Sequence, residues 1–344
     1  MTALVTGATG FLGRHLAERL LHDGQAVRAI ARSASKAQPL RKRGVEVIVG
    51  DIVDQDTVSN ALRDVDVVYH LAGRLFAPGV PAAAYYRTHV DGTATLLACC
   101  QARPGLRRFV HCSTTGVLGV TGAHPAGESA PAAPTNAYEW TKWQAEGLVN
   151  RAIADGFPAV VVRPGLVYGP GDLHLVGFFQ VIQRELFRPI GNQPVWFHPV
   201  CVDDLTEAFI TCAGNPRATG ECFHVAGREP ITVSALAQTI ATALGVPSPR
   251  GTIPMMVARA LAMAGDLLPA RLRHLAPLTS SRLEFLTSSR VYDVSKAQRL
   301  LGFVAATEIS AGIARTVRWY RQEGHLPPPQ PRSFDEAVPT EAGR

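Results

Sequence analysis

Short apolar runs alternate with amphipathic stretches along the first half of the chain. The runs have the length of buried strands and lie at residues 1–5, 26–31, 45–49, 65–71 and 108–112. Between the first two runs an amphipathic helix is expected over residues 11–21, with Gly24 as its C-cap. This alternation predicts an α/β fold, a doubly wound parallel sheet that binds ligands at the carboxyl ends of its strands.

Three glycines follow the first strand at once, in the string Thr6-Gly-Ala-Thr-Gly-Phe-Leu-Gly13. Gly7 permits a tight turn, Gly10 leaves room for a pyrophosphate near the backbone, and Gly13 lets helix and strand pack closely. The free N–H groups at the helix start face the phosphates. Because a strand and a helix flank it, the string predicts a dinucleotide site rather than an ordinary glycine-rich turn.

The end of the second strand indicates which dinucleotide is bound. Enzymes that select NAD usually carry Asp or Glu there, whereas this chain has Ala31, then Arg32 and, further on, Lys36. No carboxylate repels a 2′-phosphate and two cations can hold it, which favours NADP(H), with NAD(H) as the alternative. The competing interpretation is that both cations are solvated loop charges.

Asp51 follows the third strand, and two roles are open to it. It can accept a hydrogen bond from the adenine amino group, or it can cap the next helix. The fourth strand ends in His70-Leu71-Ala72-Gly73, where small residues let the cofactor lie against the strand end.

Tyr138 and Lys142 lie four residues apart and therefore share one face of a predicted helix. A free tyrosine has a pKa of about 10, and a neighbouring lysine ammonium is expected to lower that pKa. Tyr138 would then exchange a proton with a substrate oxygen while hydride moves to or from a nicotinamide. A hydroxyl from Thr114, just after the strand that ends at Cys112, would orient the same oxygen.

Together these strings resemble the extended short-chain dehydrogenase/reductases, the superfamily that includes the NAD-dependent epimerase/dehydratases. The resemblance runs from Met1 to about Tyr320 and is carried by residues 6–13, 50–51, 70–73, 112–119, 138–142, 163–172, 198–205 and 294–302. It implies Tyr138 as proton donor or acceptor and Lys142 as the ribose-binding residue that tunes it. It places the catalytic hydroxyl on Thr114, with Ser113 as the neighbouring alternative.

The resemblance also implies a Rossmann domain at residues 1–165, with a returning segment at about 195–225. Residues 166–194 and 226–322 would form a smaller substrate-binding domain, and the proline-rich tail at 325–344 is expected to be disordered. The implied cofactor contacts are Gly7, Thr9, Gly10, Phe11, Leu12, Arg32, Asp51, Ile52, Leu71, Ala72, Gly73, Lys142, Pro164 and Val167.

Two positions depart from the family pattern. His89 stands where the family often has Asn, and either replaces its hydrogen bonds or packs as a core histidine. Leu118 replaces a Tyr that often lies in the sugar pocket of nucleotide-sugar members, which makes an apolar substrate more plausible.

Composition restricts the partners, metal sites and compartment that we expect. The formal charge of +6 over 344 residues is modest and the basic residues are scattered, so we expect no nucleic-acid partner. Six irregularly spaced cysteines predict neither a metal site nor a disulfide framework. The chain begins one residue before its first strand, which leaves no room for a signal peptide and indicates a cytoplasmic location.

The methionine-rich stretch over residues 252–275 is apolar but too short and interrupted to span a membrane. It is expected to be a lid over an apolar substrate, a face that rests on a bilayer, or a helix packed on its own core. The predicted helices near 88–102 and 138–155 suggest the four-helix homodimer interface common in the family.

The leading hypothesis is an oxidoreductase for a hydrophobic secondary alcohol or ketone, similar to the 3β-hydroxysteroid dehydrogenase and dihydroflavonol reductase branches. The runner-up is a nucleotide-sugar epimerase with tightly held NAD, in which Arg282 or Arg290 would bind the diphosphate. A third hypothesis is a non-catalytic NADP(H)-binding protein, which the presence of both Tyr138 and Lys142 disfavours.

Overall fold

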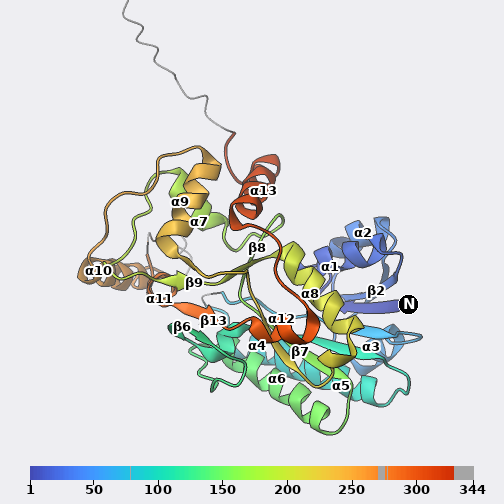
Figure 1. Cartoon of the computed structure of the whole chain (residues 1–344). Helices are drawn as coiled ribbons and strands as arrows, with labels where there is room; N and C mark the ends of the chain where they lie inside the picture. The colour runs from blue at the N-terminus through green and yellow to red at the C-terminus, as the bar shows by residue number, and fades with distance from the viewer. Residues whose placement is uncertain (78, 270–275, 277, 329–344) are drawn as a thin grey trace, which may run out of the picture.

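The computed structural model describes the chain except for residues 78, 270–275, 277 and 329–344. Its centre is a seven-stranded parallel sheet in the order β3-β2-β1-β4-β5-β7-β11 (Figure 1). The predicted doubly wound α/β fold is therefore confirmed. The strands are β1 (Thr2–Thr6), β2 (Ala26–Ala31), β3 (Glu46–Val49), β4 (Val67–His70), β5 (Arg108–Cys112), β7 (Ala159–Pro164) and β11 (Cys222–Val225).

Two strands are shorter than their apolar runs. Val45 donates its backbone N–H to Leu40 and Val65 donates to Leu62, so both valines close the turns that enter β3 and β4. Hydrophobicity alone does not distinguish a strand residue from an apolar turn residue that packs beside it.

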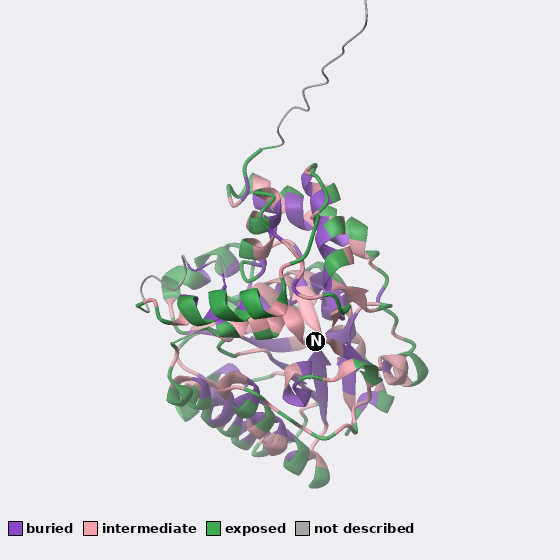
Figure 2. Cartoon of the chain, turned by 90° about the vertical axis from the view of Figure 1, so that its left-hand side faces the viewer, coloured by how far each residue is buried: buried purple, intermediate pink, exposed green. Residues whose placement is uncertain are grey.

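Helices cover both faces of the sheet. One face carries α1 (Phe11–His22), α2 (Ala34–Lys42), α8 (Val202–Gly214) and α12 (Ser295–Leu301). The other carries α3 (Gln55–Ala61), α5 (Gly92–Gln101) and α6 (Ala137–Ala154). The strands are apolar on both sides because both sides are covered, and β7 is buried throughout. In Figure 2 most of the central strands are accordingly purple and the outer helix faces green.

The helix predicted near residues 88–102 is longer and irregular. It begins with α4 (Ala82–Tyr86), passes through a π-helical turn at Arg87–Asp91, and continues as α5. Among the described residues, short 3₁₀ turns also occur at Thr115–Leu118 and Pro216–Ala218. The π turn carries His89, whose side chain is directed into the protein and is buried.

A second hydrophobic core lies beyond the carboxyl edge of the sheet. It is formed by α7 (Val176–Gln183), α9 (Val233–Leu244) and α13 (Ile309–Gln322), which gather at the top of Figure 1. Two small ladders flank it, β8 (Leu166–Tyr168) with β10 (Pro199–Cys201) and β9 (Trp196–Phe197) with β12 (Ile231–Thr232). This core is built from segments that the sequence assigned to a substrate-binding domain, with β9 and β10 from the returning segment.

A third ladder and two helices complete this half of the molecule. β6 (Gly122–Ala126) pairs with β13 (Arg290–Tyr292), and α10 (Met255–Asp266) packs against α11 (Ser280–Thr287). None of the helices in the described residues is long and apolar enough to cross a membrane.

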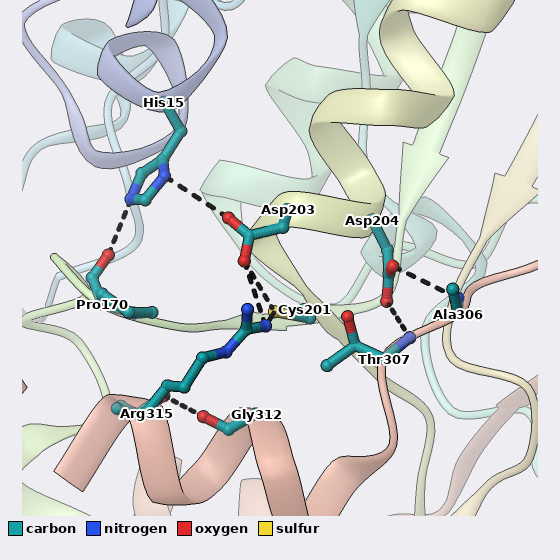
Figure 3. Close-up of polar contacts among 10 residues, drawn as sticks. His15, Pro170, Cys201, Asp203, Asp204, Ala306, Thr307, Gly312 and Arg315 are labelled. Atoms are coloured by element: carbon teal, nitrogen blue, oxygen red, sulfur yellow. Dashed lines mark hydrogen bonds and ion pairs between the residues drawn. The ribbon is translucent and has the colours of Figure 1, made fainter. Parts of the chain in front are cut away.

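A polar network joins the two halves (Figure 3). His15 on α1 contacts the Pro170 carbonyl oxygen at 2.7 Å and lies 3.8 Å from Asp203 on α8. Asp203 also pairs with Arg315 on α13 at 3.0 Å, and Asp204 accepts from the backbone N–H groups of residues 306 and 307. The start of α8 thereby holds the C-terminal segment against the helix that follows the glycine turn.

Candidate active site

A cleft of about 980 Å³ opens at the carboxyl edge of the sheet, beside β1 and β4 where the strand order reverses. All of the predicted site residues line it, which brings together segments up to 160 positions apart. They are Gly7, Thr9, Gly10, Phe11, Leu12, Arg32, Asp51, Ile52, Leu71, Ala72, Gly73, Thr114, Tyr138, Lys142, Pro164 and Val167.

The glycine turn leaves backbone exposed to the cleft. Gly7 has φ +73°, and a Cβ there would stand 2.8 Å from backbone atoms of Leu71 and Ala72. Gly10 caps α1 with no side-chain hydrogen bond, and the first turn of α1 carries no acidic residue. These uncapped N–H groups and the open backbone fit the pyrophosphate of a dinucleotide.

At the far end of the cleft, Arg32 and Lys36 are exposed and line the wall after β2. Asp51 also lines the cleft and pairs with Arg87 at 3.4 Å. The capping role considered for Asp51 is wrong. Asp54 caps α3 instead, since its carboxylate accepts from the N–H groups of Asp56 and Thr57.

The structure distinguishes Thr114 from Ser113. The Thr114 side chain interacts with Tyr138, whose pKa it lowers, and accepts from the Gly116 N–H at 3.1 Å. Ser113 is buried and donates to Glu146 at 2.6 Å. Thr114 is therefore the hydroxyl placed beside the tyrosine.

Lys142 does not act on Tyr138 as expected. Its Nζ donates to the Cys112 carbonyl oxygen, and burial lowers the pKa of Lys142 itself. Burial also raises the pKa of Tyr138 above its ordinary value, with the Thr114 hydrogen bond acting in the opposite direction. The predicted lowering of the tyrosine pKa is thus wrong for this structure, because desolvation of the phenol outweighs its polar contacts.

A buried ion pair behind the catalytic strand was missed from the sequence. Arg163 on β7 makes a two-pronged contact with Glu146, at 2.5 and 3.1 Å, and Glu146 in turn accepts from Ser113. Such a pair is costly to break once buried. Glu146 stands four residues after Lys142 on the same helix face. The spacing of four that pointed to Tyr138 and Lys142 could therefore have identified Glu146 from the sequence as well.

His89 combines both roles considered for it. It is buried, contacts the Thr141 hydroxyl at 2.8 Å and accepts from the Arg74 N–H at 3.0 Å. Its ring meets the ring of Tyr138 edge-on at 5.5 Å. Burial lowers the pKa of His89 to about 3, with Lys142 adding to the effect, so the ring is neutral at ordinary pH.

In the half of the cleft away from the glycine turn, the wall combines aromatic and polar residues from segments far apart in the chain. Its aromatic residues are Phe76, Phe197, Phe285 and Tyr292. The Tyr292 hydroxyl interacts with the side chain of Thr115, the neighbour of Thr114, and its ring stacks on His198. Polar groups on this side include Ser281, Glu284 and Arg290. Only tertiary contacts bring these residues together.

The lid interpretation of the methionine-rich stretch is wrong for its described part. The faces of α10 that pack inward hold Ala258, Ala262 and Gly265, and a Cβ at Gly265 would collide with the Leu278 backbone. Met256 and Leu267 point outward and are 82% and 86% exposed. No described residue of α10 lines the cleft, and residues 270–275 lie outside the described part.

Comparisons with known proteins agree with this geometry. The family model described as "NAD dependent epimerase/dehydratase family" matches residues 3–226. Sterol demethylase protein B of Methylococcus capsulatus is 31% identical over 95% of this chain and 100% of its own length. The 2-alkyl-3-oxoalkanoate reductase of Stenotrophomonas maltophilia is 31% identical over 92% and 98%.

The fold also matches solved structures. UDP-glucuronic acid 4-epimerase from Bacillus cereus in complex with NAD superposes with a TM-score of 0.75 and 23% identity. The match covers 94% of this chain and 99% of the epimerase. At this identity the likeness supports the fold.

Proposed function

Because the chain belongs to the NAD dependent epimerase/dehydratase family and is an oxidoreductase of the extended short-chain dehydrogenase type, we propose that it reduces or oxidises a hydrophobic ketone or secondary alcohol. The observation that carries the proposal is one cleft that holds the glycine turn, the Thr114–Tyr138 pair and an aromatic wall. The names of the two relatives, a sterol-modifying protein and an oxoalkanoate reductase, support a hydrophobic substrate.

The residues of the cleft suggest separate roles in proton transfer, substrate orientation and cofactor binding. A bound reduced nicotinamide supplies the hydride that the carbonyl carbon accepts. Tyr138 gives its phenolic proton to the carbonyl oxygen, and Thr114 orients that oxygen. The raised pKa of Tyr138 keeps the phenol protonated near neutrality, which is the form that a proton donor needs. Lys142, held at the Cys112 carbonyl, is placed to bind the cofactor ribose.

We further propose NADP(H) as the preferred cofactor. Arg32 and Lys36 are exposed at the end of β2, and Ala31 occupies the place where a carboxylate would select NAD. Both cations line the cleft, which supports a contact with a 2′-phosphate.

A homodimer through α6 and the α4–α5 helix is also proposed. Trp140 and Trp143 on α6 are 48% and 39% exposed, with their rings 5.0 Å apart, and Tyr86 on α4 is 44% exposed. Large aromatic side chains left exposed on neighbouring helices are typical of a protein interface. Dimerisation would cover them.

Two further proposals concern the surroundings of the enzyme. The exposed apolar side chains of α10 would rest on a bilayer surface, giving a peripheral contact near a lipid-like substrate. All six cysteines are free thiols, which supports a reducing, cytoplasmic compartment.

The runner-up, a nucleotide-sugar epimerase, keeps one specific observation in its favour, the guanidinium of Arg290 on the substrate side of the cleft. Reduced-nicotinamide absorbance separates the two functions. Purified protein is mixed with NADPH or NADP⁺ and pooled hydrophobic ketones and alcohols, beside pooled nucleotide sugars. Net absorbance change with the hydrophobic pool supports the oxidoreductase; sugar isomers without net change would replace it by the epimerase.

A further inference from the structure

A short loop just after β4, residues 74–77, forms part of the cleft wall without belonging to a helix or strand. Arg74, Leu75 and Phe76 line the cleft, and Leu75 is 56% exposed. Ligand pockets are lined mainly by apolar side chains, so Leu75 and Phe76 are candidates for contact with a substrate. Whatever holds this loop in place therefore influences which ligands the cleft accepts.

Two side chains of the α4–α5 helix hold loop 74–77 at its two ends. The His89 ring accepts from the Arg74 N–H at 3.0 Å. The Tyr85 hydroxyl accepts from the Ala77 N–H at 2.8 Å and donates to the Ala77 carbonyl oxygen at 3.2 Å. Among the described residues, the remaining hydrogen bond to the loop backbone is a longer one, 3.4 Å from the Val80 N–H. The loop thus depends on two side chains rather than on a backbone ladder.

The same two side chains pack against the proposed proton donor. Tyr85 and His89 are four positions apart on one helix, are both buried, and face the same way. Their rings meet the Tyr138 ring edge-on, with centroids 6.2 and 5.5 Å from it. The loop is therefore one ring away from Tyr138 at each of its anchors.

His89 also links the loop to the backbone of α6. A backbone N–H can only donate, so Nε2 of His89 accepts from Arg74, and the proton on Nδ1 is donated to the Thr141 hydroxyl at 2.8 Å. That hydroxyl lies 2.8 Å from the Ala137 carbonyl oxygen and 3.1 Å from that of Tyr138. A chain of hydrogen bonds thus runs from the loop to the first turn of α6, where Tyr138 stands.

We propose that loop 74–77 selects the substrate and that Tyr85 and His89 act as its positioning residues. This inference rests on the proposed oxidoreductase function. A ketone whose oxygen meets Tyr138 must fit its apolar part against the loop, including the exposed Leu75. A loop fixed at one place accepts few shapes, because a ligand that does not fit must break its anchoring hydrogen bonds.

The test compares the hydrophobic ketones that the native enzyme turns over fastest and slowest in the absorbance assay. Tyr85→Phe keeps the ring but removes the hydroxyl that holds Ala77. It should lower the ratio of kcat/KM for the two ketones by about fivefold or more, through a higher KM for the favoured ketone. NADPH affinity should stay within about twofold. Tyr69→Phe, at a buried tyrosine of β4 outside the cleft lining, is the matched control and should keep the native ratio.

Two substitutions of His89 separate the loop contact from the ring packing. Both His89→Gln and His89→Asn remove the imidazole from the Tyr138 ring, so kcat should fall to a similar extent in both. Glutamine can place its amide oxygen where Nε2 accepts from Arg74, whereas the shorter asparagine reaches only toward Thr141. The preference between the two ketones should survive in His89→Gln and fall by about fivefold or more in His89→Asn.

Hydrogen exchange of the backbone amides reports on the loop without turnover. The Ala77 amide should exchange at least about tenfold faster in Tyr85→Phe, and the Arg74 amide in His89→Asn, while His89→Gln keeps the native rate at Arg74. Leu75→Ala leaves both anchors intact. It should lower the ketone preference with native exchange rates and, since Leu75 is largely exposed, with the native unfolding temperature. Unfolding temperatures also show that the other variants fold.

The possible failures are distinguishable. Faster exchange in Tyr85→Phe and His89→Asn with an unchanged ketone preference overturns selection by the loop and leaves the oxidoreductase in place. Amides that stay protected in both variants, or an equal loss of preference in His89→Gln and His89→Asn, overturn the positioning role. Absence of any net absorbance change when the native enzyme meets the hydrophobic pool overturns the proposed function, and selection among ketones with it.

Discussion

The two halves of the cleft are built in different ways. The cofactor half is mainly backbone, where a glycine turn and strand ends from β1 and β4 approach one another closely. The substrate half is mainly side chains, which come from segments between Phe76 and Tyr292. A backbone site can be specified by a short local string, whereas a side-chain site depends on how distant elements pack. The first half therefore fixes the chemistry, and the second determines the substrate.

The largest expected effect, on kcat, comes from removing the Tyr138 hydroxyl, which lies where the two halves of the cleft meet. Tyr138→Phe removes the proposed proton donor and should lower kcat by about 10²–10⁴-fold, while NADPH binding stays unchanged. Steady-state kinetics and NADPH fluorescence titration measure the two quantities. Tyr86→Phe, at an exposed tyrosine on α4, is the control. Full turnover in Tyr138→Phe would end the catalytic assignment.

A backbone change should damage the cofactor half alone. Gly7→Val places a branched side chain at φ +73° and against residues 71 and 72, and should weaken NADPH binding by about 100-fold, from roughly 2–3 kcal/mol of strain and collision. Gly24→Val is matched, since φ is +74° there with nothing near. It should lose stability but bind NADPH normally. Equal binding losses in both variants would show that strain, and not the cleft, explains them.

Cofactor selection should respond to a single cation. Arg32→Ala should reduce the preference for NADPH over NADH by about tenfold or more, because a charge-assisted contact with the 2′-phosphate is lost. The ratio of kcat/KM for the two cofactors is the measurement. Arg63→Ala, an exposed arginine outside the cleft, should leave the ratio unaltered. A native enzyme that favours NADH would contradict the role of Arg32.

In the substrate half, Phe285→Ala should raise KM for a hydrophobic substrate by about tenfold, with NADPH affinity unaffected. The loss comes from apolar contact area rather than from the reacting groups. An NADPH affinity that fell in parallel would mean that the two halves are not separable at α11.

The buried histidines are expected to affect turnover at neutral pH least, and to act instead on stability at acid pH. Burial lowers the pKa values of His70 and His224 to about 3, so the unfolded chain binds more protons than the folded one below pH 6.5. The stability that they contribute is present above that pH and is lost as the pH falls toward 3, by up to about 2 kcal/mol per histidine at pH 5. Urea unfolding at pH 7 and 5 measures this loss; equal stability at both would contradict it.

The sequence predicted the sheet, the glycine turn and the Tyr138–Lys142 row, since each depends on local spacing. It did not predict that burial dominates the tyrosine pKa, because desolvation depends on what packs over the phenol. It also missed the Glu146–Arg163 pair, and it left open which face of α10 packs inward, where the buried residues are small. Such features are decided by contacts between elements far apart in the chain.

Deuterium transfer tests the central claim most directly. The enzyme is supplied with NADPH carrying deuterium at the transferable position of the nicotinamide and with a hydrophobic ketone that it turns over in the absorbance assay. We expect one deuterium in the product alcohol, on the carbon that bears the hydroxyl, and at least about 100-fold less labelled alcohol in the same time when Tyr138→Phe replaces the native enzyme. Product alcohol without deuterium, or labelled product formed equally by the Tyr138→Phe variant, would contradict hydride transfer assisted by this tyrosine.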